Sequence, residues 1–287
     1  MSTITYGPTK RDSLIDRSIT EIKSNVSSIR PYALSGCTAL TKAEFPNVTS
    51  IGNYVFRGCK LLETLDLPIQ SLTRIPTSAF SSCEKLSGPL VLSNVQTIEG
   101  NAFQNCKALT SVTFPTHAIS ISGEAFRGCS GIVGAIHIIG TGNLTLSAFR
   151  DVTGITTLVC RDFTLIGSYA FSGCSSLAIV DTTAPRLYQN QVFSSCPALS
   201  TLILRNSSPV TLDNIDSFNS TPFASGGTGG TIYIPKALYD HLGDGTSSDY
   251  KAASNWSTID GYGTITWAQI EGSQYENYYA DDTTIAS

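Results

Sequence analysis

Residues 102–106 read Ala102-Phe103-Gln104-Asn105-Cys106, and variants of this pentapeptide recur along most of the chain. Each has a small or branched residue, Phe, two polar or Gly residues, and then Cys. The other full copies lie at 55–59 (VFRGC), 79–83 (AFSSC), 125–129 (AFRGC), 170–174 (AFSGC) and 192–196 (VFSSC). Two diverged copies, 33–37 (ALSGC) and 148–152 (AFRDV), keep the spacing. A fixed period of this length is typical of stacked repeat architectures.

The rest of each unit is equally regular. Leu or Ile follows three residues after the Cys position and precedes a short alternating run that reads as a strand, such as Val112/Phe114 and Leu202/Leu204. Ile or Leu also lies four residues before most Ala or Val positions, as at Ile98. A unit of about 23 residues cannot enclose a core, so it must stack on its neighbours. We predict a right-handed α/β solenoid of about eight coils, with a parallel β-sheet on one face and short helical turns on the other.

This unit resembles the BspA-like (treponemal-type) bacterial leucine-rich repeat, in which Leu, Ile, Ala-Phe and Cys recur in the same order. The resemblance covers about residues 29–210, with departures at Leu34, at Val152 and around Tyr188. It implies the leucine-rich repeat solenoid fold. It also implies a bacterial surface adhesin that attaches to host matrix proteins, other cells or surface glycans.

Three regions follow from the extent of the repeat. We predict an N-terminal cap over residues 1–28, with an early strand at 19–22, and a solenoid over residues 29–219. Residues 220–287 are predicted to form a loop, a capping strand and helix around 231–238 and 250–257, and an aromatic tail. A polar lid is expected because an open last coil exposes apolar side chains and a sheet edge.

The eight cysteines are interpreted as core residues. Seven positions are in phase with the repeat, and Cys160 falls on an inward strand position that holds Phe114 or Leu204 in sister units. Paired metal-binding spacings such as C-x2-C do not occur in the sequence. Thiols that point in parallel into a core have poor geometry for disulfides. We therefore predict buried free thiols.

Composition excludes several partners. The net charge of -4 and the pI near 5.3 give no cationic field for nucleic acid. Charged residues make up 14% of the chain, against roughly 25% in ordinary domains, while 70 of the 287 residues are Ser or Thr. The sequence has no apolar run of membrane-spanning length, and residues 1–10 do not read as a secretory signal peptide. We expect neither nucleic-acid binding nor membrane insertion.

Candidate catalytic groups are few. The three histidines, His117, His137 and His241, have no nucleophile or metal motif around them and are interpreted as solvated. The alternative is a glycan hydrolase that uses Glu44 and Asp66 on adjacent strands. The loop 244–249 (DGTSSD) is interpreted as a surface insertion, with a calcium loop as the alternative. We predict no enzyme activity and no cofactor or metal.

A binding surface is expected on the outward face of the parallel sheet, which solenoids present as an extended platform. Exposed Val91, Val159, Ile179 and Ile203 indicate either a contact surface or cover by a lid, although strand-forming residues tolerated on a pleated face remain an alternative. The predicted ligand-binding residues are Glu44, Asp66, Val91, Thr113, His137, Val159, Arg161, Asp181, Ile203 and Arg205. A second candidate is the aromatic tail with Trp256, Tyr262, Trp267, Tyr275, Tyr278 and Tyr279.

The sequence thus predicts a non-catalytic binding protein that recognises a protein or surface glycan of a host or bacterial cell. The alternative is a phage or prophage tail-associated receptor-binding protein, because similar repeats occur there and residues 13–22 look like the lead-in of such proteins. The expected location is extracellular or at the cell surface, by export without a signal peptide or after processing, and otherwise on the virion. The sequence indicates no oligomeric state.

Overall fold

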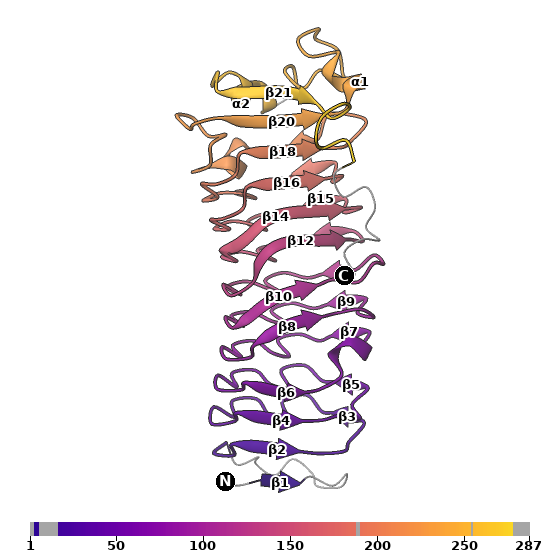
Figure 1. Cartoon of the computed structure of the whole chain (residues 1–287), viewed down its shortest axis with the longest axis vertical. Coiled ribbons are helices and arrows are strands. Elements are labelled where there is room, and N and C mark those ends of the chain that lie inside the picture. The colour runs from indigo at the N-terminus through magenta and orange to yellow at the C-terminus, as the bar shows by residue number, and fades with distance from the viewer. Residues whose placement is uncertain (1–2, 6–16, 188–189, 254, 278–287) are drawn as a thin grey trace. The chain divides into compact units, whose positions relative to one another are not determined.

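The computed structural model describes residues 3–5, 17–187, 190–253 and 255–277. The chain forms two compact units, residues 1–133 with 147–153 (the first unit) and residues 134–146 with 154–287 (the second unit). Each unit is a stack of coils, and each coil adds one strand to a parallel sheet (Figure 1). The predicted repeat solenoid with a parallel sheet along one face is confirmed.

In the first unit the strands pair in chain order. One sheet contains β1 (Thr3–Thr5), β2 (Glu21–Lys23), β4 (Lys42–Glu44) and β6 (Thr64–Asp66), and β8 (Gly88–Val91) pairs with β10 (Leu109–Thr113). The central residues Ile22, Ala43 and Leu65 lie in register and point inward. Their polar neighbours point outward, because side chains alternate along a strand.

The second unit has a longer sheet with the same alternation. Its order is β12 (Val133–Ile139), β14 (Gly154–Arg161), β16 (Ile179–Thr182), β18 (Thr201–Leu204), β20 (Gly230–Ile234) and β21 (Ile265–Gln269). Leu158, Val180, Leu202 and Ile232 are in register and fully or almost fully buried. Cys160 lies one inward position further along β14 and is also buried, as predicted.

The return segments form short ladders of their own, which the repeat pattern did not predict. In the first unit they are β3 (Ser28–Ile29) with β5 (Ser50–Ile51), and β7 (Arg74–Ile75), β9 (Thr97–Ile98) and β11 (Ser120–Ile121). In the second unit they are β13 (Asn143–Leu144), β15 (Leu165–Ile166), β17 (Arg186–Leu187) and β19 (Thr211–Leu212). The anchor of the last cysteine coil is Leu187, whereas Tyr188, the position that the spacing indicates, lies outside the described residues.

The Ala-Phe-x-x-Cys segments are tight turns, although short helical turns were expected. In the copy at 55–59, the Cys59 amide closes an i+3 turn on Phe56, while the Phe56 and Gly58 amides donate to the next coil. Tyr54 and Gly58 both have left-handed backbone conformations, with φ of 60° and 74°. Two such residues four positions apart interrupt helical geometry. The hydrogen bonds that a helix would make internally therefore join neighbouring coils.

The repeated Phe side chains form a buried stack in each unit. Phe103 lies between Phe80 and Phe126, with ring centroids 5.2 Å and 5.3 Å away and the planes within 13° of parallel. All of these rings are fully buried. Offset stacking adds to the free energy gained by burying the rings. The stack explains why Phe is so regular in the sequence.

The cysteines are free and buried, as predicted. Their thiols also have a role that the spacing did not indicate. The Cys59, Cys83 and Cys106 thiols donate to main-chain oxygens of the preceding coil at 3.1 Å. Burial raises the pKa of Cys59 to about 12 and that of Cys83 and Cys106 well above the ordinary range. These thiols are protonated donors at neutral pH.

A ninth copy of the turn, residues 217–221 (SFNST), follows the eight that the sequence predicts. The Phe218 ring stacks on Phe193 at 6.0 Å, and the Thr221 hydroxyl, at the Cys position, donates to the Phe218 carbonyl. It was missed because Ser and Thr replace both Ala and Cys. Short 3-10 helices lie at Ile69–Ser71 and Ile215–Phe218.

The closing segment contains β20, α1 (Lys236–Tyr239), α2 (Trp256–Asp260) and β21. Trp256 is fully buried and donates its indole N–H to the Val210 carbonyl at 2.7 Å. The Tyr250 hydroxyl accepts from the Val210 amide at 2.9 Å. These two aromatic residues thus satisfy both main-chain groups of Val210. None of the helices in the described part of the chain has the length and apolar character needed to cross a membrane.

Candidate functional site

The first sheet face, defined as the outward side chains of β2, β4, β6, β8 and β10, is polar and open. Glu44 accepts ion pairs from Lys23 at 2.8 Å and Lys42 at 2.5 Å. Asp66 is its register partner on the next strand and is exposed. Val91 is 42% exposed on β8, and Thr113 is exposed on β10. All four predicted ligand-binding residues of this unit are therefore accessible, Glu44 in part.

The ion pairs around Glu44 argue against the hydrolase alternative. Glu44 and Asp66 lie on adjacent paired strands, which are separated by about 4.8 Å. The two lysines hold the pKa of Glu44 at about 2, through hydrogen bonds first and charge attraction second. A general acid in glycoside hydrolysis needs the opposite shift. The arrangement is that of a charge-paired surface carboxylate.

The second sheet face comprises the outward side chains of β12, β14, β16, β18 and β20. Here three predictions of exposure are wrong: Val159 is 2% exposed, and Asp181 and Ile203 are fully buried. His137, Arg161 and Arg205 are half-buried. The alternation of the strands is as predicted, so these side chains point away from the core. Ile203 is buried under residues that follow β21, and the Asp181 carboxylate is enclosed by two arginine side chains.

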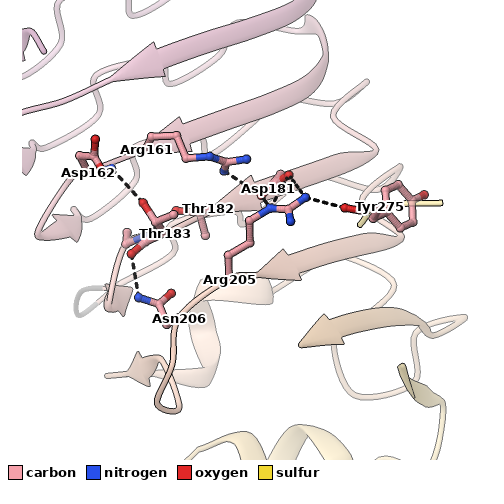
Figure 2. Close-up of polar contacts among 9 residues, drawn as sticks. Arg161, Asp162, Asp181, Thr182, Thr183, Arg205, Asn206 and Tyr275 are labelled. Atoms are coloured by element: carbon pink, nitrogen blue, oxygen red, sulfur yellow. Dashed lines mark hydrogen bonds and ion pairs between the residues drawn. The ribbon is translucent and has the colours of Figure 1, made fainter. Parts of the chain in front are cut away.

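Asp181 is the centre of an ion-pair network on the second sheet face (Figure 2). Its carboxylate accepts from Arg161 Nη1 at 2.7 Å and from Arg205 Nε and Nη2 at 2.8 and 2.9 Å. Arg161 is the last residue of β14, and Arg205 directly follows β18. These are the two strands on either side of β16, which carries Asp181. A buried carboxylate needs such partners, because an unpaired charge is strongly disfavoured away from water. The three residues act as one structural group, and not as three independent ligand contacts.

Residues 270–276, which follow β21 and are here called the covering segment, cover Ile203. Ile203, Ile270 and Tyr275 form a buried apolar cluster, against which Ile179 and Tyr233 pack. Arg205 Nη2 also donates to the Tyr275 carbonyl at 2.7 Å, so the same arginine binds Asp181 and the covering segment (Figure 2). Of the three interpretations of the outward apolar residues, the structure supports lid cover for Ile203 and Ile179. Val91 is exposed, as both a contact surface and a tolerated strand-forming residue require.

The aromatic tail does not form an exposed stacking platform within the described residues. Trp256, Trp267 and Tyr275 are buried, and Tyr262 is half-buried. Tyr278 and Tyr279 lie outside the described residues. The buried rings close the last coil, because Tyr250, Trp256 and Trp267 pack edge-on or tilted with centroids 5.4 to 6.3 Å apart.

The histidines and the acidic loop have local partners. His117 contacts the Val95 carbonyl at 3.1 Å, and His241 contacts Asp244 at 2.6 Å. The Asp244 carboxylate accepts from the Thr246 amide and hydroxyl, and Asp249 accepts from the Gly245 amide. Backbone and side-chain hydrogen bonds hold the pKa of Asp244 at about 2. These carboxylates organise the turn itself, and the described residues contain no cluster suited to a metal ion.

The contact of the covering segment with the second sheet face is the structural feature that sequence reasoning missed. Ile270 and Tyr275 stand five residues apart, and neither strand nor helix periodicity connects them. The sequence did contain one signal of the ion-pair network beneath this segment. When the repeat units are aligned, the strand with Asp181 falls between the strand that carries Arg161 and the strand that precedes Arg205. Opposite charges at neighbouring positions of adjacent strands indicate an ion pair.

Comparison with known proteins agrees with this geometry. The model of the BspA type leucine rich repeat region matches six times, over residues 15–133 and 140–238. The chain belongs to this BspA-type leucine-rich repeat family. Repeats of this kind generally serve as non-catalytic scaffolds for protein interactions. A search of the curated proteins finds no match.

Solved structures of bacterial leucine-rich repeat proteins resemble the chain. A T. pallidum leucine rich repeat protein is 26% identical, with 61% of this chain and 77% of that one covered and a TM-score of 0.48. A leucine rich cell surface protein from Faecalibacterium prausnitzii is 18% identical, with 89% and 80% covered and a TM-score of 0.40. A leucine-rich repeat protein from Bacteroides ovatus is 15% identical, with 92% and 91% covered and a TM-score of 0.44.

Proposed function

We propose that this BspA-type repeat protein is a non-catalytic binding protein whose first sheet face recognises a protein or glycan on a cell surface. The observation that carries the proposal is the open row Glu44, Asp66, Val91 and Thr113, one residue from each of four successive strands. Val91 supplies an apolar contact in this row, and the polar side chains beside it supply hydrogen-bonding groups, as in the mixed polar and apolar composition of protein interfaces. Recognition of a macromolecule suits such an extended row better than a concave small-molecule site.

The charges on this face supply specificity. Lys23 and Lys42 neutralise Glu44, whereas Asp66 is exposed next to them. A partner therefore meets fixed charges of both signs within a few residues. Such a pattern selects partners by complementarity and penalises like charges.

An array of immobilised matrix proteins and surface glycans tests the proposal with three forms of the chain. We expect Val91→Glu to reduce binding at least tenfold, because it places a desolvated charge at the centre of the contact. Leu61→Glu is the matched control, since Leu61 is 46% exposed in the same unit but lies outside the first sheet face. Equal binding by the wild type and Val91→Glu would remove the site from this face.

The same array separates the two biological settings. Binding to host matrix proteins or host glycans supports surface adhesion, which we propose as the primary role, with the protein located at the cell surface. Binding restricted to bacterial envelope glycans supports the alternative, a tail-associated receptor-binding protein on a virion. Turnover of a glycan that is lost in Glu44→Gln would contradict the non-catalytic proposal itself.

A further inference from the structure

The covering segment, residues 270–276, follows β21 and lies across the second sheet face; the Ile270 amide still donates to the Ile234 carbonyl of β20 at 2.9 Å. Ile270 and Tyr275 are buried, while the intervening Glu271, Gly272 and Gln274 are exposed. The segment therefore inserts two apolar side chains, five residues apart, and leaves its middle in solvent. This is how a peptide with two anchor residues binds a groove.

The apolar half of the contact has the composition of an interface core. The Tyr275 ring packs on the Tyr233 ring at 4.6 Å in an edge-on arrangement, and both belong to the cluster around Ile203. Ile203 is fully buried although it points away from the solenoid core. Ile270 and Tyr275, which follow β21, provide this burial. Tyrosine and arginine are typical of the centre of protein interfaces.

The polar half of the contact is a hydrogen bond to a main-chain carbonyl of the covering segment. Arg205 Nη2 donates to the Tyr275 carbonyl at 2.7 Å while Asp181 fixes the same guanidinium (Figure 2). A carbonyl is present in every residue, so this hydrogen bond does not require the sequence of the covering segment. A pre-positioned donor of this kind lowers the entropy lost on binding a peptide.

The covering segment also folds largely upon itself. The Ser273 hydroxyl donates to the Ile270 carbonyl at 2.5 Å and accepts from the Tyr275 amide at 3.1 Å, and the Glu276 amide donates to the Ser273 carbonyl. These bonds lie within the segment, so they do not depend on contact with the sheet face. By contrast, the Trp256 indole N–H is bonded to the Val210 carbonyl in the buried core of the closing segment. Opening the covering segment breaks hydrogen bonds to the rest of the unit, including Arg205 to the Tyr275 carbonyl, the Lys236 amide to the Glu271 carboxylate, and the Ile270 amide to the Ile234 carbonyl. Opening the closing segment exposes the fully buried Trp256 ring.

We propose that the covering segment is an internal occupant of a peptide-binding site on the second sheet face. The partner that displaces it is a turn-forming polypeptide with a branched apolar residue and an aromatic residue five positions apart. Its main-chain carbonyl at the aromatic residue takes the place of the Tyr275 carbonyl on Arg205. The inference deepens the proposed binding function, because it names a second site and the chemical class of its ligand.

The direct test uses a fluorescent peptide of residues 269–277, QIEGSQYEN, with the full-length chain. The double variant Ile270→Ser/Tyr275→Ser vacates the site. We expect the peptide to bind this variant at least tenfold more tightly than it binds the wild type, in which the site is occupied. A peptide carrying Tyr275→Ala is the matched ligand control and should lose at least tenfold in affinity. Ile203→Ser in the vacated chain should abolish binding.

Each measurement has an outcome that would contradict the proposal. A folded double variant, judged by circular dichroism, that binds the peptide no better than the wild type overturns the proposal. If the double variant does not fold, hydrogen exchange on the wild-type chain decides: residues 270–276 should exchange faster than β20, and equal protection overturns the proposal. Formation of a dimer by the vacated variant with wild-type chain would identify a second copy as the occupant, also against it. None of these measurements involves the first sheet face, so the outcome of the array does not affect them.

Discussion

Replacing Asp181 with Asn removes one charge from the second sheet face without changing the side-chain volume. The Asp181 carboxylate is fully buried and accepts from both Arg161 and Arg205. The two arginine side chains are 16% and 19% exposed. Asn retains one acceptor oxygen, but its amide group faces the guanidinium donors. Two largely buried cations are then left without a counter-ion.

The expected loss follows from the burial of the group. Breaking a buried ion pair by removing one partner costs about 3–5 kcal/mol. Because both arginines keep some contact with water, we expect the lower end, about 3 kcal/mol in the free energy of unfolding. For a chain of this size that loss lowers Tm by roughly 6–12 °C. Urea denaturation followed by circular dichroism measures the first quantity and calorimetry the second.

Asp66→Asn is the matched control. Asp66 occupies the equivalent outward strand position in the first unit and is exposed, so its replacement should change stability by less than about 0.5 kcal/mol. High salt separates the two positions further, since 1 M NaCl screens exposed charges far more than buried ones. An Asp181→Asn loss below about 1 kcal/mol, or one that vanishes in 1 M NaCl, would show that the network is not desolvated.

Four further outcomes follow from the coil geometry. Phe103→Ala should cost about 3–5 kcal/mol in urea denaturation, because the ring is fully buried between two stacked neighbours; a loss under 1 kcal/mol would contradict the stack. The eight thiols should resist a thiol reagent at pH 8 in the folded chain and react at once in denaturant, because all eight are buried and burial raises the pKa of thiols such as Cys106; rapid native labelling would refute this. Ser195→Gly should stabilise the fold by about 0.5–1 kcal/mol, because Ser195 has a φ of 58° and sister coils have Gly there. The ion pairs of Glu44 lower its folded pKa to about 2, so they stabilise the fold above about pH 4.3, and that contribution is lost as the pH falls from about 5 to 2. Glu44→Gln should therefore reduce the difference between the urea midpoints measured at pH 7 and pH 3. An unchanged difference would contradict the pairing.

The period of the sequence predicted the coil, its strands and its buried ladders. Phe103 and Cys106 recur in phase because each coil buries the same positions against the next one. Cys160 was assigned to the core from the alternation of its strand alone. The hydrogen bonds from thiols such as Cys59 and Cys106 to the preceding coil could not be predicted, since they depend on the path of the main chain through two left-handed residues.

The candidate site was predicted only in part. Alternation correctly placed Val91 and Ile203 on the outward side of their strands. It could not tell them apart, because exposure of an outward side chain depends on whether another segment lies over the sheet. Val91 is open, whereas Ile203 is covered by a segment about seventy residues later in the chain, as Tyr275 shows. No local pattern carries that information.

The sequence by itself determined that this protein is a stack of BspA-type coils, because a unit of about 23 residues with a fixed apolar pattern can bury that pattern only against copies of itself. Only the tertiary structure decided which outward residues meet solvent. That choice depends on long-range contacts, in which Arg205 binds Asp181 and the Tyr275 carbonyl together. Such contacts depend on the three-dimensional path of the chain, and spacing along the sequence does not encode them.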